Sequence, residues 1–302
     1  MLYVLPLFDE RHRLNVPLYA EFRHLPIFVT KGPPHMNGLT PDMLPPDLRA
    51  ILAPNEADTE KTEKLVLGLF ADSHFAEVDE LGSRRPRASY DKLKKAIEYF
   101  KSEGVNMIIC LGDLINASRD ESKDAVALQK ISELLRESGI LTYIIWGNHD
   151  TEAFDADGLW DNSGFFSAPA AVSAFGANLI LLDFNYTVDE EKYAPGTNDW
   201  MNTAMPREQM DWLKDRLRKT DGDIYVFCHQ NLDGNENDPH RIANADEVRK
   251  LLEKYENVKA VYQGHRHGGG YSRINDIEYI TLTAMCEAEN DTVESFCKVV
   301  KF

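Results

Sequence analysis

Cysteine is scarce in this chain of 302 residues, and the few cysteines form no motif. They are widely separated and include no CxxC pair: Cys110, Cys228, Cys286 and Cys297. This spacing argues against a disulfide framework and against a zinc site built on thiolates. Long apolar runs are also missing, because no stretch approaches the ~20 residues that a membrane-spanning helix needs. Since the apolar start of the chain lacks the basic segment and cleavage site of a secretory signal, we expect a soluble, cytoplasmic protein without membrane contacts.

Positive charge is in short supply. The chain has 33 Lys and Arg against 50 Asp and Glu, which gives a formal net charge of −17. A surface this acidic repels a polyanion and lacks the basic footprint of a nucleic-acid-binding protein. Bound metal cations can still dominate the local field, so the charge is compatible with a small phosphorylated substrate. The balance favours such a substrate over DNA or RNA.

The first 62 residues differ from the remainder in their proline content. Nine of the 14 prolines lie there, and residues 61–64 form a polar linker. Two short apolar stretches, 2–8 and 25–30, are candidate edge strands or extended arms, because proline interrupts them. We divide the chain into a proline-rich N-terminal extension, 1–62, and a main domain, 63–302. The extension is expected to pack on the main domain or on a second subunit, and the second arrangement would make the protein a homo-oligomer.

From residue 65 onward, apolar runs alternate with amphipathic helical patterns. The runs predict strands at 65–71, 105–111, 141–146, 179–185, 224–228, 258–262, 279–283 and 296–300. Helical patterns lie between them, for example after Ser89 and after Pro206, two residues suited to begin a helix. Strands that alternate with helices indicate an α/β fold with mostly parallel strands, closed by a hairpin-like β segment.

Polar side chains able to bind a metal follow five of these strands, at the end of each. In open α/β sheets, ligands bind in the crevice beyond the carboxyl ends of the strands. We therefore expect these side chains to meet at one edge of the fold. The predicted ligands are Asp72, His74, Asp113, Asn148, His229, His265 and His267.

The residue types suit a hydrolytic metal centre. Carboxylate, amide and imidazole groups supply oxygen and nitrogen ligands, which fit Mn, Fe, Zn, Co or Ni rather than a soft thiolate site. Two metals bridged by one carboxylate sit ~3.5–4 Å apart, clamp phosphoryl oxygens and lower the pKa of a bound water toward ~7. The hydroxide formed in this way attacks phosphorus in line with the leaving oxygen. Each short motif is weak alone, but five of the six histidines after residue 60 take part in one ordered pattern.

The order Asp-x-His, Gly-Asp, Gly-Asn-His-Asp, His and Gly-His-x-His resembles that of the calcineurin-like metallophosphoesterase superfamily, over about residues 65–302. The resemblance implies an α/β fold of two packed mixed β-sheets flanked by helices, a four-layer sandwich. It also implies two divalent or trivalent metal ions, Mn, Fe or Zn. The first would be bound by Asp72, His74 and His267 and the second by Asn148, His229 and His265, with Asp113 as the bridge. His149 would face the leaving group, as a general acid or as an electrostatic stabiliser of phosphoryl charge.

Other segments are similar to one branch of that superfamily, the manganese-dependent ADP-ribose/CDP-alcohol diphosphatases. They are Gly82–Ser89 after the first motif, Gly264–Tyr271, and Tyr279–Leu282 near the end of the chain. Enzymes of this branch cleave a pyrophosphate link in small nucleotide derivatives. Some of its members have Asp-x-Gln as the first motif, whereas His74 supplies a nitrogen ligand here, so the metal preference can differ.

Residues beside the motifs have more than one interpretation. Arg84 and Arg87 either contact a substrate phosphate through their planar guanidinium groups or belong to a solvated charge cluster ahead of a helix. Asn116 and Asp150 are expected to support the ligands from behind, Asn116 by orienting His149.

Three further positions bear on function. Asn116 also ends a Gly-Asp-Leu-Ile-Asn run that differs from the Gly-Asp-x-x-Asp-Arg-Gly of protein phosphatases and lacks the metal-binding Tyr of purple acid phosphatases. For His240, in a loop rich in Asp, Asn and Gly, a surface position is favoured over one at the site. Arg266 is expected to point away from the metals, because side chains alternate along a strand.

The leading hypothesis is a dinuclear metallohydrolase that cleaves a phosphodiester or pyrophosphate bond in a small nucleotide-like substrate. A phosphomonoesterase or a cyclic-nucleotide phosphodiesterase would use the same metals and stays open as an alternative. A nuclease is disfavoured by the acidic composition. A non-catalytic metal-binding scaffold is disfavoured as well, because such proteins lose ligands or the catalytic histidine, and all are present in this sequence.

Overall fold

The structure is a computed structural model, and it describes residues 5–7, 14–16, 28–31, 64–196, 199–288 and 292–302. Within these residues, most strands gather into two large sheets. A separate antiparallel pair joins β1 (Leu5–Leu7) and β2 (Leu14–Val16). Most of the predicted extension, including parts of the candidate strands at 2–8 and 25–30, lies outside the described residues.

The first large sheet has five strands in the described part of the chain. Its order is β14 (Lys298–Lys301), β4 (Val66–Phe70), β5 (Met107–Cys110), β6 (Leu141–Ile144) and β7 (Phe166–Ser167). Strands β4 to β7 are parallel, and β14 pairs with β4 in the antiparallel direction. The strands predicted at 65–71, 105–111, 141–146 and 296–300 are confirmed, with small differences at their ends.

The second large sheet has seven described strands. Its order is β12 (Gly268–Ile274), β13 (Ile277–Thr283), β11 (Val258–Gln263), β10 (Ile224–Phe227), β9 (Ala177–Leu181), β8 (Ala170–Ala174) and β3 (Phe28–Lys31). The four strands β13, β11, β10 and β9 are parallel, and the other three are antiparallel to their neighbours. Strand β3 comes from the segment that we separated as an extension, and it lies at the edge of this sheet, where a proline-interrupted run is tolerated.

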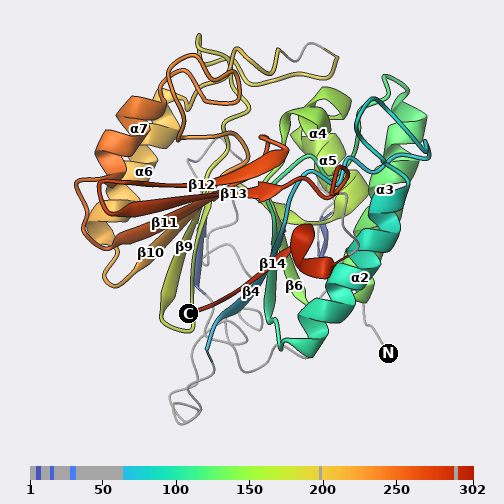
Figure 1. The fold of residues 1–302 in the computed structure, drawn as a ribbon, viewed down its shortest axis with the longest axis horizontal. Coiled ribbons are helices and arrows are strands. Elements are labelled where there is room, and N and C mark those ends of the chain that lie inside the picture. The colour runs from blue at the N-terminus through green and yellow to red at the C-terminus, as the bar shows by residue number, and fades with distance from the viewer. Residues whose placement is uncertain (1–4, 8–13, 17–27, 32–63, 197–198, 289–291) are drawn as a thin grey trace.

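Helices cover the outer faces of both sheets. Figure 1 shows α6 and α7 at the left and α2 and α3 at the right, with the sheets between them. The helices are α2 (Ala88–Ser102), α3 (Glu121–Glu137), α4 (Asn148–Ala153), α5 (Ala156–Ser163), α6 (Arg207–Lys219), α7 (Ala245–Leu252) and the short 3₁₀ helix η2 (Val293–Ser295). This arrangement confirms the predicted fold class, two packed mixed sheets flanked by helices.

Alternation of side chains along the strands builds these layers. Leu67 and Leu69 of β4 lie in the core between the two sheets, together with Phe227 of β10. The opposite face of β4 lies under α2, which contributes Phe100 to a second core cluster. A Cβ at Gly68 would come within 2.8 Å of the Phe100 ring, so glycine at this position lets the helix approach the strand.

The sheets also contain elements that the sequence did not predict. The strand expected at 179–185 ends earlier, as β9, and β7 and β8 arise from 166–174, a run of small residues without clear alternation. Phe165 is buried in the core, and Trp160 lies 6.0 Å from the Phe166 ring, so these aromatic residues cover the core. Within the described ranges, none of the helices has the length and apolar character needed to cross a membrane.

Candidate metal centre

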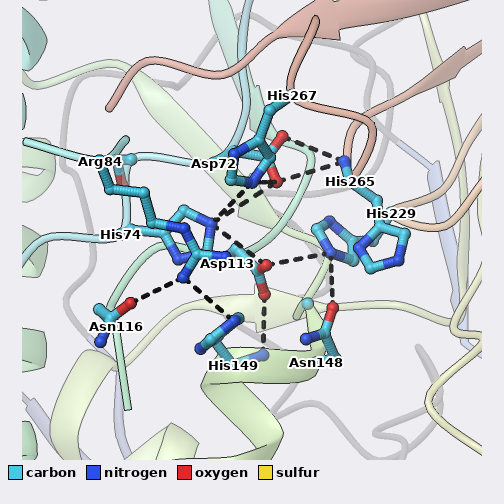
Figure 2. A network of polar contacts seen from close by, with 12 residues as sticks. Asp72, His74, Arg84, Asp113, Asn116, Asn148, His149, His229, His265 and His267 are labelled. Atoms are coloured by element: carbon cyan, nitrogen blue, oxygen red, sulfur yellow. Dashed lines mark hydrogen bonds and ion pairs between the residues drawn. The ribbon is translucent and has the colours of Figure 1, made fainter. Parts of the chain in front are cut away.

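Seven polar side chains from the ends of five strands converge in one place (Figure 2). They follow β4, β5, β6, β10 and β11, which belong to both large sheets. Six of the seven are buried, and His267 is partly exposed. The structure therefore brings together every ligand predicted from the sequence: Asp72, His74, Asp113, Asn148, His229, His265 and His267.

The backbone at these positions is unusual. Asp72, His74, Asp113 and His265 have φ angles of 53°, 43°, 52° and 66°, in the left-handed region that non-glycine residues rarely adopt. Each such residue costs on the order of 1–3 kcal/mol and persists only where its surroundings hold it. Here the N–H groups of Asp72 and His74 donate to the carbonyls of Gly112 and Asp113, both over 2.9 Å. The two loops thus hold the side chains in place through backbone bonds.

Two glycines leave room for the ligands. A Cβ at Gly147 would overlap the Asp113 carboxylate, and a Cβ at Gly112 would overlap the His229 imidazole. Gly112 also has a φ of +104°, which favours glycine whatever the space. The glycines next to the ligands are therefore required by close packing inside the site.

A first group of ligand atoms lies around His74 and His267. The Nε2 atoms of these two imidazoles are 3.1 Å apart. His267 donates from Nδ1 to Oε1 of Glu287 over 2.8 Å, which leaves its Nε2 without a proton in the neutral ring. Carboxylate oxygens are close as well, since Nε2 of His74 is 3.4 Å from Oδ2 of Asp113 and 4.0 Å from Oδ1 of Asp72. Lone pairs and negative charge that converge in this way fit a bound cation.

A second group lies around His229. Its Nδ1 donates to the carbonyl of Leu111 over 2.7 Å, so the neutral ring turns a lone pair on Nε2 toward the site. This Nε2 is 3.2 Å from Oδ1 of Asn148 and 3.4 Å from Oδ2 of Asp113. Nε2 of His265 is buried and has no hydrogen-bond partner among the described residues. A buried imidazole nitrogen that lacks a hydrogen-bond partner and lies near other acceptor atoms is suited to bind a metal ion.

Burial and neighbouring charges set the protonation of these groups. Burial holds the pKa of His74 and of His265 well below the usual value, so both rings stay neutral and available as ligands. For His229, burial acts in the same direction, but the charge of Asp113 and its hydrogen bond outweigh burial and raise the pKa to about 9. Burial raises the pKa of Asp72 to about 6. In the metal-free protein, the positive charge of protonated His229 thus balances the negative charge of Asp113.

His149 lies beside these ligands and touches Arg84. Its backbone N–H donates to Oδ1 of Asp113 over 2.8 Å, and its ring packs edge-on against His74 with centroids 4.7 Å apart. Nη1 of Arg84 lies 3.3 Å from Nε2 of His149 and donates to Oδ1 of Asn116 over 3.0 Å. Because a guanidinium has no acceptor, Nε2 of His149 is the acceptor in this contact. Asn116 thus reaches His149 through Arg84 rather than directly, as Figure 2 shows.

The other two predicted residues lie farther from the ligand atoms. The Asp150 carboxylate accepts hydrogen bonds from the backbone N–H groups of Gly147, Leu114 and Ile115, and so ties the loop after β6 to the loop after β5. Arg87 is half-exposed, and it donates to Oδ1 of Asp79 over 2.5 Å and to the carbonyl oxygen of Glu77 over the same distance. Of the two predicted substrate-binding arginines, the structure places Arg84 at the centre and pairs Arg87 with acidic groups outside it.

Four residues of the centre were missed in the sequence. Glu287 bonds to His267, and Sγ of Cys286 lies within 4.8 Å of ring nitrogens of His74 and His267. Both follow β13 in a segment without a recognisable motif, so only their place in the fold reveals them.

The other two pack on the second group of ligands. The rings of Trp200 and His240 each lie 5.3 Å from the ring of His265. The expected surface position of His240 is only partly right, because a third of its side chain is exposed while the ring packs on a predicted ligand.

The chain is similar to known phosphoesterases. Residues 65–269 match the family described as Calcineurin-like phosphoesterase. The chain is 25% identical to the manganese-dependent ADP-ribose/CDP-alcohol diphosphatase of Danio rerio, over 73% of this chain and 87% of the relative. It is 26% identical to the 3',5'-cyclic adenosine monophosphate phosphodiesterase of Haemophilus influenzae, over 75% of this chain and 79% of the relative.

Solved structures share the fold. A dimetal phosphatase from Danio rerio matches with a TM-score of 0.62 at 21% identity, over 74% of this chain and 88% of the other. A purple acid phosphatase from yellow lupin matches with a TM-score of 0.52 at 15% identity, over 80% of this chain and 48% of the other. With the family match across more than half of its length, the chain belongs to the calcineurin-like phosphoesterase family and is a metal-dependent phosphoester hydrolase.

Proposed function

We propose that the protein hydrolyses a phosphodiester or pyrophosphate bond in a small nucleotide-like substrate, with two metal ions bound at this centre. The observation that carries the proposal is the position of Asp113. Its Oδ2 lies 3.4 Å from Nε2 of His74 and 3.4 Å from Nε2 of His229. One carboxylate oxygen is thus shared between the two groups of ligand atoms, as a bridge between two metals requires.

The ligand sets follow from the two groups. Asp72, His74 and His267 would hold the first metal, Asn148, His229 and His265 the second, and Asp113 both. Oxygen and nitrogen donors of this kind fit manganese, iron or zinc, and the manganese dependence in the name of the Danio rerio relative supports manganese. When bound, such a pair clamps phosphoryl oxygens and lowers the pKa of water enough to make it a nucleophile.

The chain itself supplies the groups that act on the rest of the phosphoryl unit. Arg84 is partly exposed beside His149, so its guanidinium can meet a phosphoryl oxygen through the N–H groups that do not face Asn116. His149 is held by its backbone bond to Asp113, and we assign it to the leaving group, where it stabilises negative charge or delivers a proton. Both residues act as fixed electrostatic partners of the transition state.

The nucleotide-like substrate class is supported by the relatives. The Danio rerio relative is named for ADP-ribose and CDP-alcohols and the Haemophilus influenzae relative for a cyclic nucleotide. These names favour pyrophosphate hydrolysis and, as a second candidate, cyclic-nucleotide hydrolysis. The net charge of −17 adds support for a small substrate, because a nucleic acid would be repelled.

A substrate panel tests the proposal. The metal-free protein is loaded with manganese, iron or zinc and assayed with ADP-ribose, 3',5'-cyclic AMP, bis-(p-nitrophenyl) phosphate and p-nitrophenyl phosphate. We expect cleavage of the diester or pyrophosphate substrates to exceed that of the monoester, and to require metal. A preference for the monoester would replace the proposal with a phosphomonoesterase, and no cleavage with any metal would refute it.

A variant of His149 separates catalysis from metal binding. His149→Ala should lower kcat by about 100-fold to 10,000-fold, the usual contribution of a proton-transferring group, with metal content close to that of the unmodified protein. Loss of metal together with activity would instead make His149 part of the metal site.

A further inference from the structure

Three rings pack together on the outer side of the second ligand group. Trp200 and His240 each lie 5.3 Å from the His265 ring, at interplanar angles of 70° and 73°. They also touch each other, with centroids 5.6 Å apart. Both side chains are only partly buried, so each has a surface open to solvent beside a metal ligand. We call Trp200 and His240 the aromatic wall.

The His240 ring is held in a defined orientation. Its Nδ1 donates to Oδ1 of Asp238 over 2.9 Å, and its backbone N–H donates to the same oxygen over 3.0 Å. Because Nδ1 carries the proton of the neutral ring, Nε2 is left with a free lone pair. One carboxylate oxygen thus holds both the ring and the backbone of His240.

Asp238 is fixed in turn by the segment that carries two of the ligands. Its Oδ2 accepts a hydrogen bond over 2.7 Å from Nη2 of Arg266, the residue between His265 and His267. Nη1 of Arg266 lies 3.6 Å from Oδ1 of the buried Asp233. The guanidinium is thus engaged by two carboxylates, neither of which belongs to a predicted metal ligand. This chain of contacts links the position of His240 to that of the metal centre.

The charges around the wall indicate what it binds. The two carboxylate partners of Arg266 offset its positive charge. Arg266 is therefore not available to bind a further phosphate group on this side of the centre. Arg84, in contrast, lies on the opposite side from His265 (Figure 2). A substrate whose phosphoryl group meets Arg84 would extend its uncharged part toward the wall. An indole face and a free imidazole acceptor suit a planar base that carries N–H groups, or the hydroxyls of an attached ribose.

We propose that Trp200 and His240 form the recognition site for the nucleoside part of the substrate, with the base packed on Trp200 and a hydrogen bond accepted by Nε2 of His240. Asp238 is a positioning residue that fixes the His240 ring. This assignment rests on the proposed function, which supplies the substrate class. It adds the residues that distinguish a nucleotide-like substrate from phosphodiesters without a base.

Binding of two ligands tests the wall without turnover. AMP and ribose 5-phosphate differ only by the base, and their affinities for the manganese-loaded protein are measured by calorimetry. Because base stacking on an aromatic residue is worth about a factor of 10 or more, AMP should bind about 10-fold more tightly than ribose 5-phosphate. Trp200→Leu should remove this difference. Equal affinities in the unmodified protein, or an unchanged difference in Trp200→Leu, would overturn the proposal.

Kinetics supply the second measurement. The ratio of kcat/KM for ADP-ribose to that for glycerophosphoethanolamine, a diester without a ring, should fall about 10-fold in Trp200→Leu and in His240→Ala, mainly through KM for ADP-ribose. Trp212→Phe on α6 is the matched control and should leave the ratio unchanged, because Trp212 packs on the core beneath that helix. An equal loss on both substrates would show that the rings only support His265.

The two proposals can fail separately. If the protein hydrolyses none of the substrates but Trp200→Leu abolishes the preference for AMP, the role of the aromatic wall is supported and the proposed function is refuted. If ADP-ribose is cleaved but the base makes no difference to binding, the proposed function is supported and the role of the aromatic wall is refuted. Metal content and thermal unfolding of each variant show whether a loss reflects a disturbed fold.

Discussion

His267 donates its Nδ1 hydrogen to Oε1 of Glu287 over 2.8 Å. The bond selects the tautomer whose Nε2 is free and aims that atom at Nε2 of His74, 3.1 Å away. Glu287 is itself held, because the Ser83 hydroxyl donates to the same oxygen over 2.7 Å. Glu287, the partner of the predicted metal ligand His267, thus comes from a segment without a recognisable metal-binding motif.

Removing Glu287 should weaken metal binding. Outer partners of metal-bound histidines typically contribute a factor of about 10 to 100 in affinity, so we expect a loss of this size for manganese in Glu287→Ala. Titration of the metal-free protein with manganese measures it. Glu287→Gln is the matched variant, because its amide oxygen can still accept the Nδ1 hydrogen and should restore part of the affinity. Equal affinities of Glu287→Ala and the unmodified protein would exclude an orienting role.

Gly147 should not tolerate a side chain. A Cβ at this position would overlap the Asp113 carboxylate. One oxygen of this carboxylate accepts the His149 N–H, and the other lies between the two groups of ligand atoms. We expect Gly147→Ala to lose most bound metal and activity, as measured by metal analysis of the purified protein. Gly268→Ala is the control in the nearby strand β12, because a Cβ there meets nothing within 4 Å and should have little effect.

The sequence predicted which side chains meet at the centre, because each of them follows a strand. Asp72 comes directly after a buried apolar run, and Asp113 follows another with one glycine between; the carboxyl ends of both runs share one edge of the fold. Residues such as Glu287 and Trp200 could not be predicted in this way. Glu287 reaches the centre because the end of β13 lies beside the loop after β4, where the Cys286 N–H donates to the Asp72 carbonyl. No local pattern records such a tertiary contact.

The arginines near the first motif illustrate the same limit. Arg84 and Arg87 are three residues apart and chemically identical, so the sequence treats them alike. Their neighbours separate them, since Arg84 contacts Asn116 and His149 whereas Arg87 bonds to Asp79. In the fold, strand β3 shows a comparable effect, because its pairing with β8 joins segments far apart in the chain.

Arg84→Ala should lower kcat by about 100-fold to 1,000-fold, the range for losing one fixed donor to transition-state charge. The metal content should stay the same, because Arg84 contacts Asn116 and His149, and neither of them is a predicted metal ligand. Arg84→Lys should recover only part of kcat, since an ammonium cannot donate to Asn116 and a phosphoryl oxygen in the same planar geometry. Arg87→Ala provides the comparison, and its effect should be much smaller, because its guanidinium already pairs with Asp79 and Glu77. A loss in Arg87→Ala as large as that in Arg84→Ala would place both arginines on the substrate.

Metal affinity should rise with pH. In the metal-free protein the pKa of His229 is raised to about 9 and that of Asp72 to about 6, so His229 carries a proton at neutral pH. A metal must displace this proton, and each displaced proton makes affinity rise by about a factor of 10 per pH unit below the pKa. Between about pH 6 and pH 8 the manganese affinity should therefore rise by about 100-fold, which titrations at several pH values would measure. His229→Asn keeps an oxygen ligand without the titrating ring, and its affinity should depend less on pH.

The same shift has the opposite consequence for folding of the metal-free protein. Because the pKa of His229 in the folded state lies above the usual 6.5, its protonated ring stabilises the fold fully below that pH. This stabilisation is lost as pH rises toward about 9. Denaturant unfolding should therefore show the metal-free protein losing stability over this range, while the manganese-loaded protein, in which the metal has replaced the proton, should not. A metal-free protein whose stability does not change between these pH values would contradict the protonation assigned to His229.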